Sequence, residues 1–296
     1  MFRLRRAVMP LLVAVVGACG SGGPGSGSTT VIDFVPPPVE PTTTTTSATL
    51  PTTTTAAALP TIEARVYFLR GETVWPFSRL VPRDATVAGA VRELLRGPSD
   101  AETALGAASA VPDGVVLHGV SIINGVATID VSAAFGSGGG SASMTGRVAQ
   151  VVFTATQFPD VDSVAFAIDG TNITVLGGEG LVLDHPQTRA DWESRAPGVL
   201  LEAPLAFADV HSLVHLTGTA NTFEALFLVR LTDGAGRVVY DHATMASSGT
   251  GTRGTFDLTV SVPGASPGSG TITVYEESGL DGSPINIVDI PVRWRA

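Results

Sequence analysis

The 296-residue chain is acidic, with a formal net charge of −10, and all 17 of its basic residues are arginine. Such a chain is a poor nucleic-acid binder, because no continuous basic patch would neutralise phosphates. Its 44% hydrophobic content is ample for folded cores. About 235 residues remain beyond a low-complexity start, and that length predicts two modest domains.

The first residues have the three-part layout of a secretory signal. Arg3, Arg5 and Arg6 form a positive start, residues 7–16 are apolar, and small residues precede Cys19. The apolar run would reach roughly 15 Å as a helix, whereas a spanning helix must cross roughly 30 Å of hydrocarbon. We therefore interpret residues 1–18 as a signal peptide, whose removal with its three arginines leaves a net charge of −13.

Cys19 is the only cysteine of the chain. The box Val16-Gly17-Ala18 before it resembles the bacterial lipobox, in which the first mature thiol is diacylated. A lone thiol exported to an oxidising compartment has no disulfide partner, so we expect lipidation at Cys19. The alternative is a plain secretory signal with a chance or buried structural cysteine. Lipidation predicts an extracytoplasmic chain anchored to the outer face of the cytoplasmic membrane.

Residues 19–60 are rich in Gly, Pro and Thr and low in complexity. This composition cannot bury enough apolar surface to offset its ordering entropy, and it predicts a disordered tether. A flexible chain of this length reaches roughly 35 Å end to end. Its threonine clusters could carry O-linked sugar, or the segment could be a spacer with no further role.

Residues 61–195 alternate between strand and helix periods. Residues 64–70 alternate as a strand, and Asp84 can cap a helix that Gly97-Pro98 ends. Asn124-Gly125 lies between the strand-like runs 115–123 and 126–131 and predicts a hairpin, because both turn residues need positive φ.

The second half of this domain continues the alternation. One apolar stripe predicts a helix over residues 142–158, and the runs 164–168 and 173–176 predict closing strands. The expected fold is a small α+β domain, with two helices on one face of a mixed, mostly antiparallel sheet.

Residues 196–296 lose the helical period. Turn signals such as Asp233-Gly234 and Asp281-Gly282 separate six short alternating runs. The runs are residues 213–218, 225–232, 238–242, 255–262, 270–276 and 285–294. This pattern predicts an all-β immunoglobulin-like sandwich, without the paired cysteines of antibody domains.

The first domain resembles the GerMN domain of sporulation and spore-germination proteins. The features that match are the helix end Leu94-Leu95-Arg96-Gly97-Pro98, the run 125–132 with Phe135, and Gln157-Phe158-Pro159 followed by residues 164–170. The resemblance implies an envelope protein that makes protein or wall contacts, and the family brings no catalytic residues.

The second domain resembles the immunoglobulin-like domain of bacterial spore germination, which often follows GerMN in actinobacterial and firmicute lipoproteins. Its matching segments are residues 218–224, 254–256, 275–278, 281–283 and 290–292. The two resemblances cover nearly all of the chain that we expect to fold.

Two motifs could suggest chemistry. Ser266 lies in a Gly-x-Ser-x-Gly string, but the next residue, Pro267, has no N–H for an oxyanion hole. The glycine-rich loop 136–141 could hold phosphate at a helix start, yet it lacks a complete dinucleotide or P-loop fingerprint, which favours a simple turn.

Three further groups of side chains could bind a ligand. His211 and His215 are four apart but lie in a strand pattern without a third metal ligand. The acidic residues Glu276, Glu277 and Asp281 could line a calcium site, although a solvated turn is favoured. Trp75, Trp192 and Trp294 could stack on carbohydrate, but core or junction positions are favoured.

The sequence thus predicts a non-enzymatic cell-envelope lipoprotein of the GerMN type that acts as a protein- or wall-binding scaffold. Its expected partners are envelope proteins or a cell-wall polymer, with a membrane contact through the lipid, no nucleic acid and no cofactor or metal. The sandwich and the sheet edges are the expected contact surfaces. The alternative is a glycan-binding module that recognises peptidoglycan or another wall polysaccharide.

Overall fold

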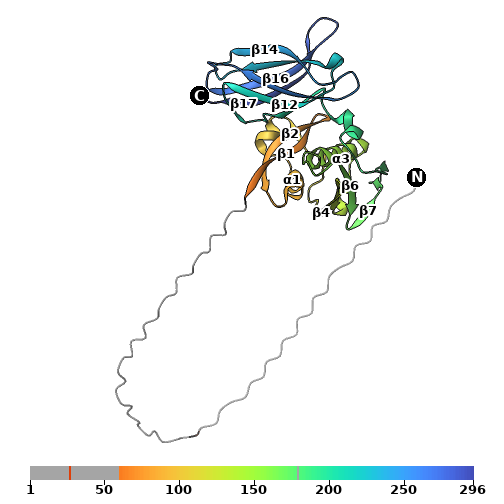
Figure 1. Cartoon of the computed structure of the whole chain (residues 1–296). Helices are drawn as coiled ribbons and strands as arrows, with labels where there is room; N and C mark the ends of the chain where they lie inside the picture. The colour runs from red at the N-terminus through yellow and green to blue at the C-terminus, as the bar shows by residue number, and fades with distance from the viewer. Residues whose placement is uncertain (1–26, 28–59, 179) are drawn as a thin grey trace, which may run out of the picture. The chain divides into compact units, whose positions relative to one another are not determined.

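The structure of the protein is a computed structural model that describes residues 27, 60–178 and 180–296 (Figure 1). The predicted signal peptide, Cys19 and nearly all of the predicted tether lie outside these residues. Residues 60–178 and 180–296 belong to one compact unit, which contains both predicted domains.

The first domain opens with a three-stranded sheet in the order β2-β1-β3. Its strands are β1 (Thr61–Arg70), β2 (Thr73–Pro82) and β3 (Ala107–Ala108). The predicted strand over residues 64–70 is confirmed, but β2 was missed. Pro76 disfavours a strand at this position in the sequence. The proline is tolerated in β2 because β2 is an edge strand that pairs only with β1.

The part of the chain that the structure describes has three α-helices, all in the first domain. They are α1 (Thr86–Leu95), α2 (Asp100–Ala104) and α3 (Ser141–Ala155). The predicted cap at Asp84 is wrong: Ala85 is the N-cap of α1 and makes no side-chain cap hydrogen bond. The short α2 was not predicted, although Ser99 and Glu102 form a reciprocal capping box.

A second sheet has the order β4-β5-β6-β7. Its strands are β4 (Leu117–Ile123), β5 (Val126–Val131), β6 (Ser163–Ile168) and β7 (Thr171–Ile173). The predicted hairpin is confirmed, with φ of 50° at Asn124 and 78° at Gly125. β5 and β6 are parallel, and α3 lies in the crossover between them. A small hairpin of β8 (Val175–Leu176) and β9 (Leu181–Val182) follows.

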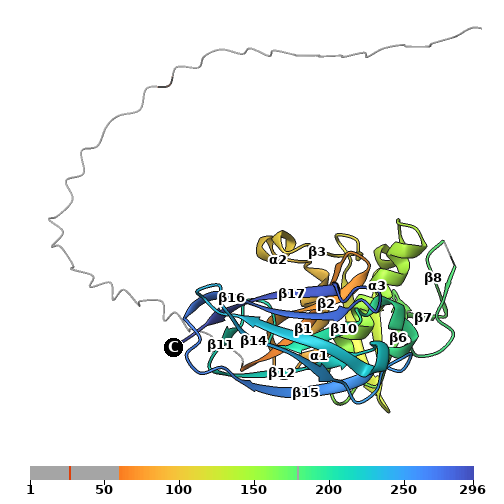
Figure 2. The ribbon, with the colours of Figure 1, turned by 90° about the horizontal axis from the view of Figure 1, so that it is seen from above.

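The second domain is the predicted sandwich of two sheets. One has the order β10-β12-β15 and the other the order β11-β17-β16-β13-β14. The strands are β10 (Val199–Ala203), β11 (Asp209–Val210), β12 (Leu213–Ala220), β13 (Leu226–Thr232), β14 (Val238–Met245), β15 (Gly254–Ser261), β16 (Gly268–Glu277) and β17 (Pro284–Trp294). Figure 2 shows β12 and β15 running side by side, as their register requires. The six predicted runs match β12–β17, whereas β10 and β11 were missed.

One continuous apolar core runs through both domains. Buried residues of the first sheet and of α3 belong to the same cluster as the buried residues of the sandwich, from Val66 to Trp294. The boundary between the domains is therefore packed rather than solvated.

Candidate functional site

The two domains meet at a partly buried carboxylate. Glu202 on β10 accepts a hydrogen bond from the Tyr67 hydroxyl on β1 and another, of 2.7 Å, from the Nη1 atom of Arg189. Arg189 lies at the start of the short 3₁₀ helix η2 (Ala190–Arg195). It also donates to the Thr156 hydroxyl (2.9 Å) and to the Phe153 carbonyl (3.1 Å) at the end of α3. One arginine thus connects the first domain to the first strand of the second.

The charges at this junction stabilise one another. Burial acts to raise the pKa of Glu202, but the positive charges of Arg189 and Arg65 and the hydrogen bonds from Tyr67 and Arg189 together outweigh it. That pKa therefore lies below its ordinary value of 4.5. Burial raises the pKa of Tyr67, and the neighbouring Glu202 adds to this effect. The Arg189 guanidinium also lies 5.3 Å from the Tyr67 ring and 5.0 Å from the Phe153 ring, within cation–π range. At neutral pH the junction therefore holds an ionised Glu202 and a protonated Tyr67.

A second ion pair crosses the junction. The Nε atom of Arg253, just before β15, lies 2.9 Å from Glu193 of η2. Glu193 also accepts a bond of 2.8 Å from Asn221, and Arg253 donates to the Pro197 carbonyl at 2.7 Å. The segment that joins the domains is therefore fixed by side chains from both.

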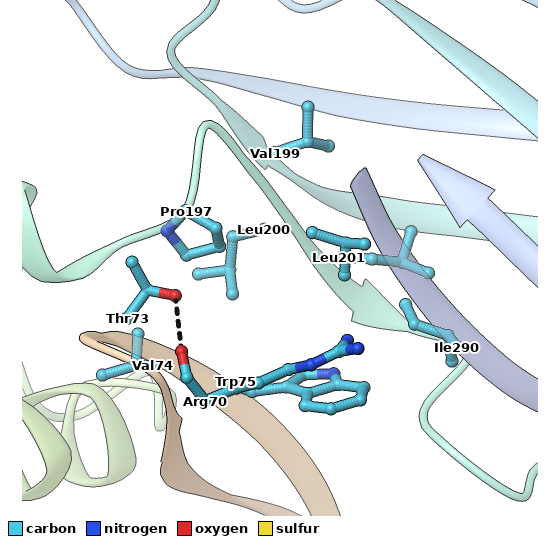
Figure 3. A pocket seen from close by; sticks show the side chains of 10 residues that line it. Arg70, Thr73, Val74, Trp75, Pro197, Val199, Leu200, Leu201 and Ile290 are labelled. Carbon is cyan, nitrogen blue, oxygen red and sulfur yellow. Dashed lines mark hydrogen bonds between the residues drawn. The ribbon is translucent and has the colours of Figure 1, made fainter. Parts of the chain in front are cut away.

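Apolar packing completes the contact (Figure 3). Trp75 on β2 lies beneath the guanidinium of Arg70, 4.3 Å from the ring centre, and faces Leu200 and Ile290. The cavity among these residues has a volume of about 30 Å³. That is the space of one water molecule, so the cavity is a packing gap and too small for an organic ligand.

Two wider clefts border the junction. One, of about 370 Å³, is lined by Arg65, Gln157 and Glu202 among others. The other, of about 510 Å³, is lined by Arg189, Glu193 and Arg253 among others. The three charged groups of the larger cleft already bond to protein partners. The larger cleft is thus suited to holding the domains together rather than to acid–base or nucleophilic chemistry.

The three tryptophans are buried. Trp75 is at the junction, Trp192 is in η2, and Trp294 donates from Nε1 to the Thr232 carbonyl at 2.9 Å. Each is less than a tenth exposed, and none offers a ring face for sugar stacking. The core interpretation of these residues is confirmed.

Ser266 lies in the connection between β15 and β16, as the sequence suggested. Its N–H donates to Asp233 at 3.0 Å, and its hydroxyl accepts from Arg237 at 3.2 Å. Asp233 also accepts from the backbone of Ala235 and Arg237. These hydrogen bonds hold the pKa of Asp233 below its usual range, and the bond from the Ser266 N–H contributes most. The serine therefore belongs to a tightly bonded turn.

The glycine-rich loop 136–141 surrounds a buried cation. Arg147 of α3 is 2% exposed, and its guanidinium donates to the carbonyls of Phe135 (2.7 Å), Ser137 (2.9 Å) and Gly138 (2.6 Å). Its Nε atom donates to the Ala110 carbonyl at 2.8 Å. The loop thus presents carbonyl oxygens to an arginine, the opposite of the N–H donors that a phosphate site needs.

The remaining candidates do not converge. His215 pairs with Asp257 across two strands at 2.6 Å, and Asp281 accepts from the Ser283 hydroxyl at 2.7 Å. Glu276 accepts from Asn286 at 2.9 Å. Within residues 60–178 and 180–296, no three His, Cys, Asp or Glu side chains are grouped as a metal site would need.

Sequence reasoning missed the junction residues. Tyr67 and Glu202 are 135 positions apart, and Tyr67 and Arg189 are 122 apart, so neither pair falls within a local motif. None of the helices in the described part of the chain is long and apolar enough to cross a bilayer.

Two family descriptions match the chain. "Sporulation and spore germination" matches residues 65–174, and "Immunoglobulin-like domain of bacterial spore germination" matches residues 199–283. The resemblances expected from the sequence are confirmed, and the first domain is GerMN-like. No protein with a curated description matches the chain.

Solved structures are also similar. The tandem GerMN domains of the sporulation protein GerM from Bacillus subtilis match at 16% identity and a TM-score of 0.38, over 68% of this chain and 62% of that one, less than two thirds of its length. The first GerMN domain of the same protein matches at 20% identity and 0.36, over 43% and 98%. A putative lipoprotein from Clostridium perfringens matches at 20% identity and 0.33, over 44% and 89%.

Proposed function

We propose that this chain, with a sporulation and spore germination domain followed by an immunoglobulin-like domain of bacterial spore germination, is a sporulation- or germination-associated protein that acts as a non-enzymatic binding scaffold of the cell envelope. In this proposal its two domains act as one rigid unit, which presents surfaces of both domains to partner proteins.

The junction is the observation that carries the proposal. Arg189 and Glu202 are partly buried and bonded to each other, and Arg253 and Glu193 form a second pair. Together with the continuous core, these pairs favour one fixed orientation of the domains. A fixed orientation suits a scaffold, because no ordering entropy is lost between the domains when a partner binds both.

Anchoring is the second part of the proposal. We infer that Cys19 carries a lipid and that residues 20–60 tether the folded unit to the outer face of the cytoplasmic membrane. A flexible tether of this length would hold the unit at an average distance of roughly 35 Å from its anchor.

Crosslinking in cells tests the scaffold. Mild crosslinking followed by pull-down of the tagged chain should recover the same protein partner from repeated cultures. Retention on purified cell wall, with no protein partner, would instead support the glycan-binding alternative. Hydrolysis of wall fragments or esters by the purified mature chain would contradict a non-enzymatic role.

A further inference from the structure

Exposed apolar side chains gather at one end of the five-stranded sheet. Within the residues that the structure describes, this end holds six of the large hydrophobic side chains that solvent reaches. They are Phe223, Leu226, Met245, Leu280, Ile285 and Ile287, which we call the apolar end.

The strand register brings these residues together. Leu226 on β13 is directly opposite Met245 on the edge strand β14. On the other side of β13, Leu228 is opposite Tyr275 of β16, so continuing this register places Leu226 beside Glu277, where the β16–β17 hairpin begins. Ile285 on β17 is opposite Glu276 on β16, and Leu280 lies in the turn between these two strands. The six side chains therefore share one end of a single sheet.

A strained turn displays Phe223. The residues that follow it, Glu224 and Ala225, both have positive φ, of 54° and 61°, which non-glycine residues rarely adopt. The turn is held by the Thr250 hydroxyl, which accepts from the Glu224 N–H at 2.9 Å, and by the Thr250 N–H, which donates to the Thr222 carbonyl at 2.8 Å. Its result is a phenylalanine that is 72% exposed. A surface built in this way is ordered before any partner arrives.

Acidic residues surround this apolar surface. The three segments that form it, residues 221–226, 245–252 and 276–287, contain four acidic residues and no arginine, lysine or histidine. Glu224, Glu277 and Asp281 are exposed. The Ser283 hydroxyl and N–H lower the pKa of Asp281, so that carboxylate stays ionised at neutral pH. A complementary surface would be apolar with a basic border.

We propose that the apolar end docks a basic amphipathic segment of a partner protein, in which apolar side chains are flanked by arginine or lysine. This inference rests on the scaffold function proposed above and names the chemistry of its partner. The edge strand β14 offers such a segment a free strand edge beside Met245, so an extended segment can add to the sheet.

Methionine methyl NMR on the mature chain with Cys19→Ser tests the docking. Met144 and Met245 are the only methionines after residue 18; Met245 is 63% exposed and Met144 is 2% exposed. The probes are three synthetic heptapeptides: one alternates leucine and arginine, one leucine and glutamate, and one glycine and arginine. We expect only the leucine–arginine peptide to shift the Met245 signal, with Met144 unchanged as an internal control for the fold.

Matched variants locate the contact. Phe223→Ser should weaken binding of the leucine–arginine peptide about tenfold, which is the loss expected when a residue at the centre of an interface is truncated. Leu80→Ser, at a side chain with a similar exposure of 70% on β2, should leave it unchanged. Glu277→Arg should weaken it several-fold, whereas Asp160→Arg, at another exposed acid, should not.

Other outcomes overturn the docking proposal. Equal binding of the leucine–glutamate peptide would remove the role of the acidic border, and equal binding of the glycine–arginine peptide would remove the role of the apolar side chains. A Met245 shift caused by phosphatidylcholine vesicles alone would assign the surface to lipid, and a shift caused by dilution alone would assign it to a second copy. A protein partner captured in cells that binds equally well to the Phe223→Ser chain would leave the scaffold standing and contradict this surface.

Discussion

The Tyr67 hydroxyl donates a hydrogen bond to the carboxylate of Glu202, although 135 positions separate the two residues and they belong to different domains. Arg189 bonds to the same carboxylate and, at 3.3 Å, to the same hydroxyl. The contact therefore joins a strand of the GerMN-like domain to the first strand of the immunoglobulin-like domain.

Removing one charge of the Arg189–Glu202 ion pair should destabilise the protein more than removing both charges. Arg189→Met leaves Glu202 partly buried without its counter-charge, and we expect the free energy of unfolding to fall by about 3 kcal/mol. The double variant Arg189→Met with Glu202→Met removes both charges, and its loss should be no more than about 1 kcal/mol. Urea unfolding of the three chains measures this. Equal losses in the single and double variants would show that the charges are not coupled.

Acid should weaken the junction. Because Glu202 has a folded pKa below its ordinary value of 4.5, its contribution to stability is complete above pH 4.5 and is lost as the pH falls through the folded pKa. Glu202→Gln cannot titrate, so its stability deficit relative to the original chain should shrink as the pH is lowered from 7 to 3. Urea midpoints across this range check the sign, and a deficit that grew toward pH 3 would refute the assignment.

The glycine-rich loop should depend on Arg147. Lysine at this position has three donors on a single nitrogen and cannot reach four carbonyls that the guanidinium now satisfies. We expect Arg147→Lys to lower the free energy of unfolding by about 3 kcal/mol, since buried acceptors lose their partners. Hydrogen exchange in residues 136–140 should accelerate. Arg92→Lys, at an exposed position on α1, is the matched control and should change neither quantity.

Cys19 should control membrane association. We expect Cys19→Ala to move the protein from the membrane fraction to the soluble fraction, because it removes the proposed site of lipid attachment. Cell fractionation with mass spectrometry of the mature N-terminus measures this. A Cys19→Ala chain that remained fully with the membrane would rule out the lipid anchor.

Local patterns predicted the elements that are exposed on one side. The strands β12, β13 and β15 alternate between buried and more exposed residues, and Asn124-Gly125 has the positive φ values that only such residues adopt easily. The strand β2 was not predicted, because Val74, Trp75 and Phe77 are buried in a nearly continuous run that includes Pro76. A strand buried on both faces has no period of two, and a proline disfavours it further.

The junction could not be predicted from local sequence. Nothing near Arg189 in the chain identifies Glu202 as its partner, because the pairing follows from how β1, α3 and β10 pack in space. Arg147 was likewise read as part of an ordinary helix, since its four carbonyl partners come from the loop and from Ala110. Periodicity shows which face of an element is buried, but not which distant residue completes a polar cluster.

The most direct test of the rigid scaffold is a distance between its domains. Spin labels at Ser121→Cys on β4 and Thr259→Cys on β15, in a Cys19→Ser chain, report this distance by double electron–electron resonance. Both positions are exposed, and the chain then has no other cysteine. We predict a single narrow distance distribution that broadens when Arg189→Met is added. A broad distribution in the chain that retains Arg189 would contradict the rigid scaffold.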